Sequence, residues 1–208
     1  MHSTINISQR FTKTVFKKLI LFTALASSTL LAKNINYDFE KTDLSKWNTY
    51  GKWEITTDNK EHCLSMLQRS AGRFNLCYTK DANFTDGNIS VEFKANRGRI
   101  DQGGGVMWRV QDNDNYYVAR FNPLEDNFRF YIVHDGIRSE LASVDIKLSS
   151  GWHTMKIEQK GDIFKGYIDN KQELEDKNAQ LKKAGGVGVW TKADAQTSFD
   201  NLKIETSR

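Results

Sequence analysis

Apolar and polar residues alternate along most of this chain with a period of two, at which every second side chain reaches the same face of a β-strand. The longest example runs from Gly103 to Asp135, and turn residues interrupt it at Asp112–Asp114 and at Asn122–Pro123. The pattern predicts three antiparallel strands with one buried face. We expect that face to carry Val106, Trp108, Val110, Tyr117, Ala119, Phe121, Phe128, Phe130 and Ile132.

Similar segments recur from Asn36 to Glu205, separated by Gly, Asn and Asp turns. Roughly a dozen short strands, each with one apolar and one polar face, predict an all-β fold in which two antiparallel sheets share a core. In Asn88–Ala95, for example, Ile89, Val91 and Phe93 alternate with polar residues. Only Asp176 to Lys183 has the composition of a short helix.

The first 32 residues differ from this pattern. Four Lys or Arg residues precede a largely apolar run of 14 residues, Leu19 to Ala32, which is too short to span a bilayer and is typical of a signal peptide. Cleavage after Ala32 is the preferred interpretation, the small residues of Ala24–Ala26 offer a second point, and an uncleaved anchor stays open. We expect a signal peptide at 1–32 and one periplasmic or secreted domain at 33–208.

The leader also accounts for the net charge of +4, because its four basic residues leave 30 − 4 = 26 Lys and Arg against 26 Asp and Glu. A neutral domain with interspersed charges gives no electrostatic reason to expect nucleic-acid binding, and none for binding to an anionic membrane. Removal of the leader would also leave nothing to insert into a membrane.

Cys63 and Cys77 are the only cysteines, and they lie on two strand-like segments joined by Ser70–Gly72. A hairpin centred on Ser70 would place them opposite each other, and export favours a disulfide. Such a crosslink would stabilise the fold by roughly 3 kcal/mol in the chain-entropy model. A pair of reduced core cysteines is the alternative.

Two longer motifs carry a resemblance to a known family. They are GGVMWRVQDNDNYYVARF at Gly104–Phe121 and GGVGVWTKADAQTSFDNLKI at Gly185–Ile204. With the intervening segments they resemble the concanavalin A-like lectin/glucanase superfamily, closest to laminin-G-like domains called 3-keto-disaccharide hydrolase-like or family-16-glycosidase-like. The resemblance covers about residues 36–205 and implies a two-sheet jelly roll whose concave face in relatives often holds sugar.

Catalytic signatures are mostly missing from the sequence. The paired acids of active family-16 glycosidases, E-x-D-x-x-E or E-x-D-x-E, do not occur, and neither do common hydrolase or phosphate-binding motifs. His62, His134 and His153 are scattered along the chain. We therefore expect no catalytic residues, and no cofactor is required.

The polar face of the central strands is the better candidate for function. Aromatic rings stack on sugar faces, and arginines hydrogen-bond hydroxyl groups or carboxylates. Glycines beside a tryptophan would leave room for a sugar ring. Side chains that merely cover a sheet are the alternative. The candidate ligand-binding residues are Glu92, Arg109, Tyr116, Arg120, Tyr131 and Trp190, with Glu92 expected to pair with one of the arginines.

Acidic residues also gather near the two ends of the domain. Jelly rolls often pair their first and last strands, and several relatives hold a structural calcium there. Asp38, Glu40 and Asp200 are the candidate calcium ligands, with backbone carbonyls completing the coordination. Solvated acids at a sheet edge are an equally good interpretation.

The sequence thus predicts an exported, non-catalytic domain that binds saccharide on the concave sheet. A glycoside hydrolase of the 3-keto-disaccharide type is the first alternative. A structural or protein-interaction module of the laminin-G type is the second.

Overall fold

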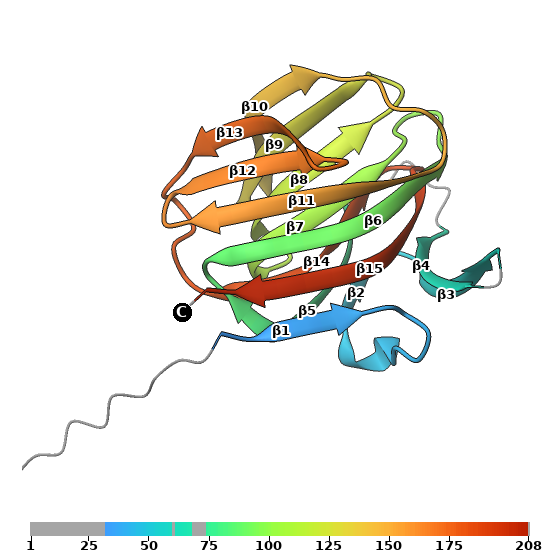
Figure 1. Cartoon of the computed structure of the whole chain (residues 1–208), viewed down its shortest axis with the longest axis horizontal. Helices are drawn as coiled ribbons and strands as arrows, with labels where there is room; N and C mark the ends of the chain where they lie inside the picture. The colour runs from blue at the N-terminus through green and yellow to red at the C-terminus, as the bar shows by residue number, and fades with distance from the viewer. Residues whose placement is uncertain (1–31, 60, 68–73, 208) are drawn as a thin grey trace, which may run out of the picture. The chain divides into compact units, whose positions relative to one another are not determined.

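The computed structural model describes residues 32–59, 61–67 and 74–207, so the predicted leader, its cleavage points and the Ser70–Gly72 turn lie outside the described residues. In the described part, fifteen strands form two sheets in which every strand pair is antiparallel (Figure 1). This two-sheet all-β architecture confirms the fold class that the period-two pattern predicts.

The eight-stranded sheet has the order β13-β12-β11-β6-β15-β4-β3, and β1 also pairs with β15. Its strands are β1 (Asn34–Tyr37), β3 (Trp53–Asp58), β4 (Glu61–Met66), β6 (Gly87–Arg97), β11 (Trp152–Lys160), β12 (Ile163–Ile168), β13 (Lys171–Lys177) and β15 (Gln196–Thr206). The pairing of β1 with β15 confirms that the first and last strands are neighbours.

The seven-stranded sheet has the order β10-β9-β8-β7-β14-β5-β2. Its strands are β2 (Asn48–Tyr50), β5 (Phe74–Phe84), β7 (Gly104–Asp112), β8 (Asn115–Asn122), β9 (Asn127–His134), β10 (Ile137–Asp145) and β14 (Gly185–Lys192). The meander β7–β8–β9–β10 is the segment in which the sequence pattern is clearest.

The main core lies between the sheets and contains the alternating residues that the pattern predicts. From the seven-stranded sheet it takes Val106, Trp108, Tyr117, Ala119, Phe121, Phe128, Phe130 and Ile132, and from β6 it takes Ile89, Val91 and Phe93. Trp108 is fully buried, and its indole nitrogen donates to Gln159 Oε1 at 2.8 Å. The burial of this many apolar side chains is the main stabilising contribution to such a fold.

Strand β7 departs from regular alternation just after Trp108. The register with β8 shifts between Trp108 and Asp112, and Arg109 has a positive φ of 47°. This bulge moves Val110 out of the main core, where we expected it, into a second apolar cluster on the outer face of the sheet. It also sends Arg109 away from the face on which alternation had placed it.

The cysteine prediction is wrong. Cys63 pairs with Thr56 within the eight-stranded sheet, whereas Cys77 lies opposite Val189 in the seven-stranded sheet. Both thiols are free and buried, because the chain passes from one sheet to the other between β4 and β5 instead of forming a hairpin. Burial raises the pKa of the Cys77 thiol, which disfavours the reactive thiolate.

The predicted helix at Asp176–Lys183 is also not formed. Asp176 and Lys177 belong to β13, where they pair with β12. Among the described residues the one helical element is the 3-10 turn η1 (Leu44–Lys46), whose Asp43 side chain accepts from the Ser45 amide. None of the described helical residues forms a segment long and apolar enough to cross a membrane.

Candidate functional site

The outer face of the seven-stranded sheet, the side turned away from the main core, has an apolar cluster of its own. It consists of Leu76, Tyr78, Met107, Val110, Tyr116, Val118, Tyr131, Val133 and Trp190, with Phe74 packed against it. These side chains come from the alternate positions of β5, β7, β8, β9 and β14. All nine side chains of the cluster are buried and only Phe74 is partly exposed, so this side of the sheet has a small apolar core of its own beneath the polar groups that lie over it.

Trp190 is the floor of this face and not an open stacking surface. Its ring is fully buried, its Nε1 donates to Tyr116 Oη at 3.1 Å, and the Phe74 ring lies 5.3 Å away. Burial raises the pKa of Tyr116, so its hydroxyl stays neutral. Nor does Gly188 leave room for a ligand, because a Cβ there would meet the Cys77 carbonyl on β5.

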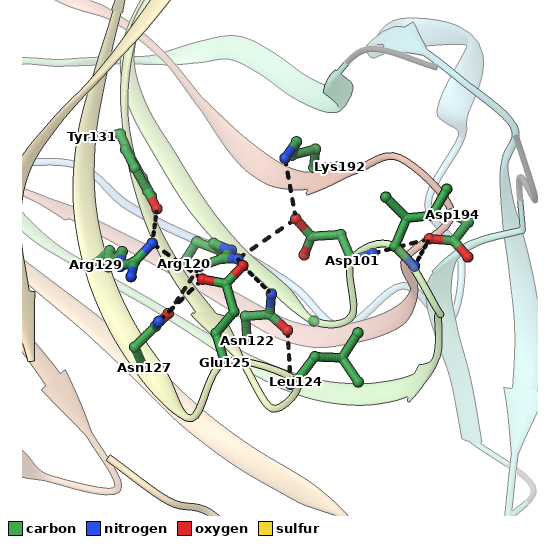
Figure 2. A network of polar contacts seen from close by, with 12 residues as sticks. Asp101, Arg120, Asn122, Leu124, Glu125, Asn127, Arg129, Tyr131, Lys192 and Asp194 are labelled. Atoms are coloured by element: carbon green, nitrogen blue, oxygen red, sulfur yellow. Dashed lines mark hydrogen bonds and ion pairs between the residues drawn. The ribbon is translucent and has the colours of Figure 1, made fainter. Parts of the chain in front are cut away.

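A polar network lies beside the apolar cluster, on β8, β9 and the turn between them (Figure 2). Arg120 is almost completely buried and donates to Asn127 Oδ1 at 3.0 Å and to Glu125 Oε1 at 3.1 Å. Arg129 contacts the other Glu125 oxygen at 3.1 Å and the Tyr131 hydroxyl at 3.3 Å. Burial raises the pKa of Glu125, but the Asn127 amide and the two guanidinium groups outweigh it and lower the pKa overall.

Asp101 is the carboxylate at the centre of the site, and its side chain is only 3% exposed. One of its oxygens lies 3.6 Å from Arg120 Nη2 and 3.8 Å from Lys192 Nζ, which are ion-pair distances beyond hydrogen-bond range (Figure 2). Burial raises the pKa of Asp101, and the positive charges of Arg120 and Lys192 offset this only in part.

Asp101 could not be predicted from the alternating pattern, because it lies in a loop. The loop is held by Asp194, whose carboxylate accepts the backbone N–H groups of Arg99, Ile100 and Asp101 at 2.9, 3.0 and 3.1 Å (Figure 2). An acid just before Gly103–Gly105 and the start of β7 was the signal that could have drawn attention to it.

Arg138, on β10, was missed as well. It pairs with Val133 and therefore lies on the outer face, where its guanidinium carbon is 4.4 Å from the Tyr131 ring centre, 5.6 Å from Phe74 and 6.0 Å from Trp190. Its Nη1 atom is buried without a hydrogen-bond partner among the described residues.

The structure thus brings four of the predicted ligand-binding residues to one face: Tyr116, Arg120, Tyr131 and Trp190. Arg109 lies elsewhere, at an end of the sandwich, where it donates to the carbonyls of Thr85, Leu181 and Gly161 and pairs with Asp86 at 3.1 Å. It fastens turns of the chain together.

Glu92 is also separate from the candidate site. It lies on β6 of the eight-stranded sheet, opposite Asp200 on β15, and accepts from Asn201 Nδ2 at 3.2 Å. The expectation that it pairs with Arg109 or Arg120 is therefore wrong, because the two arginines belong to the other sheet.

The three residues predicted as calcium ligands do not fit together as a calcium site. Both Glu40 oxygens are bound by His62, through its amide and its Nδ1 atom at 2.8 Å each, and Asp38 accepts from the Glu40 amide at 3.2 Å. In the described segments no group of three or more His, Cys, Asp or Glu side chains is arranged to hold a metal ion. Burial, opposed by the Asn201 amide, raises the pKa of Asp200 to about 6.

A serine, a histidine and an aspartate come together near the start of β11. His153 Nδ1 is 2.7 Å from Asp169 Oδ2, and its Nε2 is 3.4 Å from Ser149 Oγ. However, Nε2 is closer to the Ser149 carbonyl oxygen, at 3.0 Å. Both ring nitrogens therefore face acceptors, which suits a brace between two turns better than a base that takes a proton from the serine.

The fold and the covered outer face define a class: an antiparallel two-sheet sandwich of the concanavalin A-like, jelly-roll type. More specifically, the chain belongs to the family of 3-keto-alpha-glucoside-1,2-lyase-like domains, which match residues 36–205. No curated protein sequence matches it.

Solved structures with a similar fold include the carbohydrate-binding module CBM66 from Bacillus subtilis, with 23% identity, a TM-score of 0.64 and coverage of 78% of this chain and 96% of that one. The Bacillus licheniformis beta-glucanase has 10% identity, a TM-score of 0.60 and coverage of 84% and 98%. The VIP36 exoplasmic/lumenal domain in its Ca²⁺/Man-bound form has 12% identity, a TM-score of 0.56 and coverage of 76% and 82%.

Proposed function

We propose that this protein binds saccharide on the outer face of the seven-stranded sheet, with Asp101 as the central polar contact. The observation that carries the proposal is the state of this carboxylate. It is nearly buried, it lies among cations, and the nearest of them, Arg120 and Lys192, are 3.6 and 3.8 Å away. A nearly buried carboxylate whose nearest cations lie beyond hydrogen-bond range still has acceptor capacity, and sugar hydroxyl groups are donors that would use it.

The apolar part of the face suits the other side of a sugar ring. Phe74 and Tyr131 flank the Arg138 guanidinium, and the half-exposed Tyr50 borders a hollow of about 660 Å³ beside Phe74. Binding sites that combine apolar walls with a few placed polar groups are typical of small-molecule ligands. The names of two similar structures, a carbohydrate-binding module and a mannose-bound domain, support the same function.

A glycan array with the purified protein tests the proposal, followed by titration of each bound glycan against Asp101→Asn. The matched control is Asp58→Asn, because Asp58 also pairs with a lysine, Lys94 at 2.7 Å, but on the eight-stranded sheet. We expect Asp101→Asn to lower affinity at least about tenfold, or about 1.4 kcal/mol, because a hydrogen bond to a charged group contributes about 1.5–3 kcal/mol. The control should bind normally.

Two results would contradict the proposal. One is a folded Asp101→Asn variant that binds as well as the unmodified protein. The other is a folded protein that binds no glycan on the array, which would favour the protein-interaction alternative.

The raised pKa of Asp101 favours a second candidate function, an elimination reaction on a 3-keto-glucoside, as the family description suggests. Asp101 would take the proton from C2 of the keto sugar, a C1=C2 double bond would form as the C1–O bond breaks, and the proton held by Asp101 would pass to the departing oxygen, which leaves as an alcohol. Arg120 and Lys192 would stabilise the negative charge that forms on the C3 oxygen.

Incubation with a 3-keto disaccharide tests this candidate. It predicts release of the second sugar together with an unsaturated keto sugar that absorbs in the ultraviolet, and Asp101→Asn should abolish both. Binding of the disaccharide without any product would contradict the elimination reaction and support only the binding function.

A further inference from the structure

Resting on the proposed binding function, we infer that the saccharide is acidic: Arg138, together with Lys192, binds a carboxylate or sulfate group on the sugar, while Asp101 accepts from its hydroxyl groups. Arg138 makes no ion pair with the described residues, so no carboxylate neutralises its charge. A guanidinium laid across three aromatic rings, with its Nη1 buried and unpartnered, is therefore the feature that requires a function.

The three acids nearest to Arg120 and Lys192 on this face are already engaged by those cations and by Arg129. Glu125 pairs with Arg120 and Arg129, each at 3.1 Å. Arg129 also pairs with Glu140 at 3.4 Å, and Asp101 lies near Arg120 and Lys192. Around Asp101 the face therefore carries four cations, Arg120, Arg129, Arg138 and Lys192, and three carboxylates, Asp101, Glu125 and Glu140; Asp114 and Asp135 lie apart from this group, at the hollow beside Phe74.

Arg138 is the one of these four cations that has no carboxylate within 4 Å among the described residues, whereas each of the other three has one. Arg138 also acts on Asp101: its charge, with those of Arg120 and Lys192, lowers the pKa of that carboxyl against the effect of burial. Because several cations surround one shielded carboxylate, they would still attract a second negative charge. A ligand oxyanion would form charge-assisted hydrogen bonds with the guanidinium, which are about twice as strong as neutral ones.

The charged residues around the site also determine which end of the saccharide carries the acidic group. The hollow of about 660 Å³ beside Phe74 is lined on its far side by Asp114 and Asp135. These acids would repel an anion, so the charged group belongs at the Lys192 end and a neutral part of the saccharide belongs in the hollow, against Phe74 and Tyr50. Tyr50 borders this hollow and is among the most exposed large apolar residues of the described chain, so it extends the contact surface at that end.

The test uses an array that contains oligogalacturonates, glucuronoxylan oligosaccharides and sulfated galactans, each with its neutral counterpart. The best-bound acidic glycan is then titrated in two forms, unmodified and with its acidic group removed by carboxyl reduction or desulfation. We expect the neutral form to bind at least about tenfold more weakly, the loss of one charge-assisted contact. The uronate and sulfate members of the array distinguish the two sources of negative charge.

Arg138→Gln is the variant that assigns the effect to this residue. It should bind the acidic form at least about tenfold more weakly than the unmodified protein does, yet bind the neutral form equally well. The matched control is Lys156→Gln, because Lys156 also lies over an aromatic ring, Tyr167 at 4.1 Å, but on the eight-stranded sheet. If Arg138→Gln does not fold, the comparison of the two glycan forms on the unmodified protein still decides.

The inference is overturned if the best-bound glycan is neutral, or if removal of the acidic group leaves the affinity unchanged. Neutral glycans that bind in an Asp101-dependent way would leave the proposed function standing and remove only this inference. A folded protein that binds no glycan at all would remove both.

Discussion

Replacement of Trp190 by alanine tests how the outer face is built. Alternation along β14 correctly places the indole on this face, which would normally make the ring dispensable for folding. The structure instead buries it completely beneath Phe74 and Arg138 and bonds its Nε1 to Tyr116 Oη at 3.1 Å. Removal of a fully buried tryptophan side chain costs about 3–5 kcal/mol, because apolar contacts are lost and a cavity remains.

Thermal unfolding measures this cost. A domain of this size loses about 2–4 °C of Tm per kcal/mol, so Trp190→Ala should lower the Tm by about 6–20 °C. Trp108→Ala in the main core should be comparably severe, since that ring is equally buried. A Trp190→Ala variant that melts within about 2 °C of the unmodified protein would show that the ring does not support the fold, and the description of the face would be wrong.

A double-mutant cycle isolates the hydrogen bond from the packing. Trp190→Phe keeps most of the ring and removes the donor, whereas Tyr116→Phe removes the acceptor and leaves the indole N–H without a partner. Each single change should cost about 1–3 kcal/mol. The double variant should cost less than the sum by about 1 kcal/mol, because the second change removes nothing further. Strict additivity would mean that the bond contributes nothing.

Three further predictions concern residues outside the face. Arg109→Met should destabilise the fold by at least about 2 kcal/mol in urea unfolding, because three carbonyls and Asp86 lose a charged donor; unchanged stability would contradict its role as a fastener. Cys63 and Cys77 should both react with a thiol reagent in the denatured, unreduced protein and resist it in the folded protein. If neither thiol reacts after denaturation, the two cysteines form a disulfide after all. The pKa of Asp200 in the folded protein, about 6, lies above its ordinary value of 3.8, so its ionisation destabilises the fold as the pH rises from 3.8 through 6. After allowance for solvent screening, Asp200→Asn should be about 1–2 kcal/mol more stable than the unmodified protein at pH 8 and equally stable at pH 3.5 in denaturant titrations. Equal stability of the two proteins at pH 8 would contradict the prediction.

The fold could be predicted because it depends on alternation, which sequence displays directly. Phe128, Phe130 and Ile132 are buried in the main core, as every second residue of a strand that faces the opposite sheet must be. The same reasoning fails at Arg109, because one bulge reverses the side on which later residues of β7 lie. It fails for the cysteines because local hairpin geometry was assumed between β4 and β5, which belong to different sheets.

The candidate site was harder to predict because its polar groups come from segments without a periodic pattern. Asp101 is placed by a loop whose amides bind Asp194, a residue 93 positions away. Arg138 follows a turn, and it becomes a candidate binding residue only because its guanidinium lies against the rings of Tyr131, Phe74 and Trp190, which three other strands supply. Sequence reasoning found the strands of the face, and it could not find the contacts between distant segments that make the face a site.

The construction of this face also implies how stability and binding are related. Tyr116 and Trp190 form a rigid floor, and Glu125 and Asn127 hold Arg120 in one position. Side chains that are already ordered lose little entropy when a ligand binds, which increases affinity. Changes to the floor should therefore weaken folding and binding together, because the same packing orders Arg138. Asp101→Asn should separate them: it removes the negative charge and replaces one of the two acceptor oxygens by an amide donor, while the Tyr116–Trp190 floor stays in place, so binding should fall more than stability.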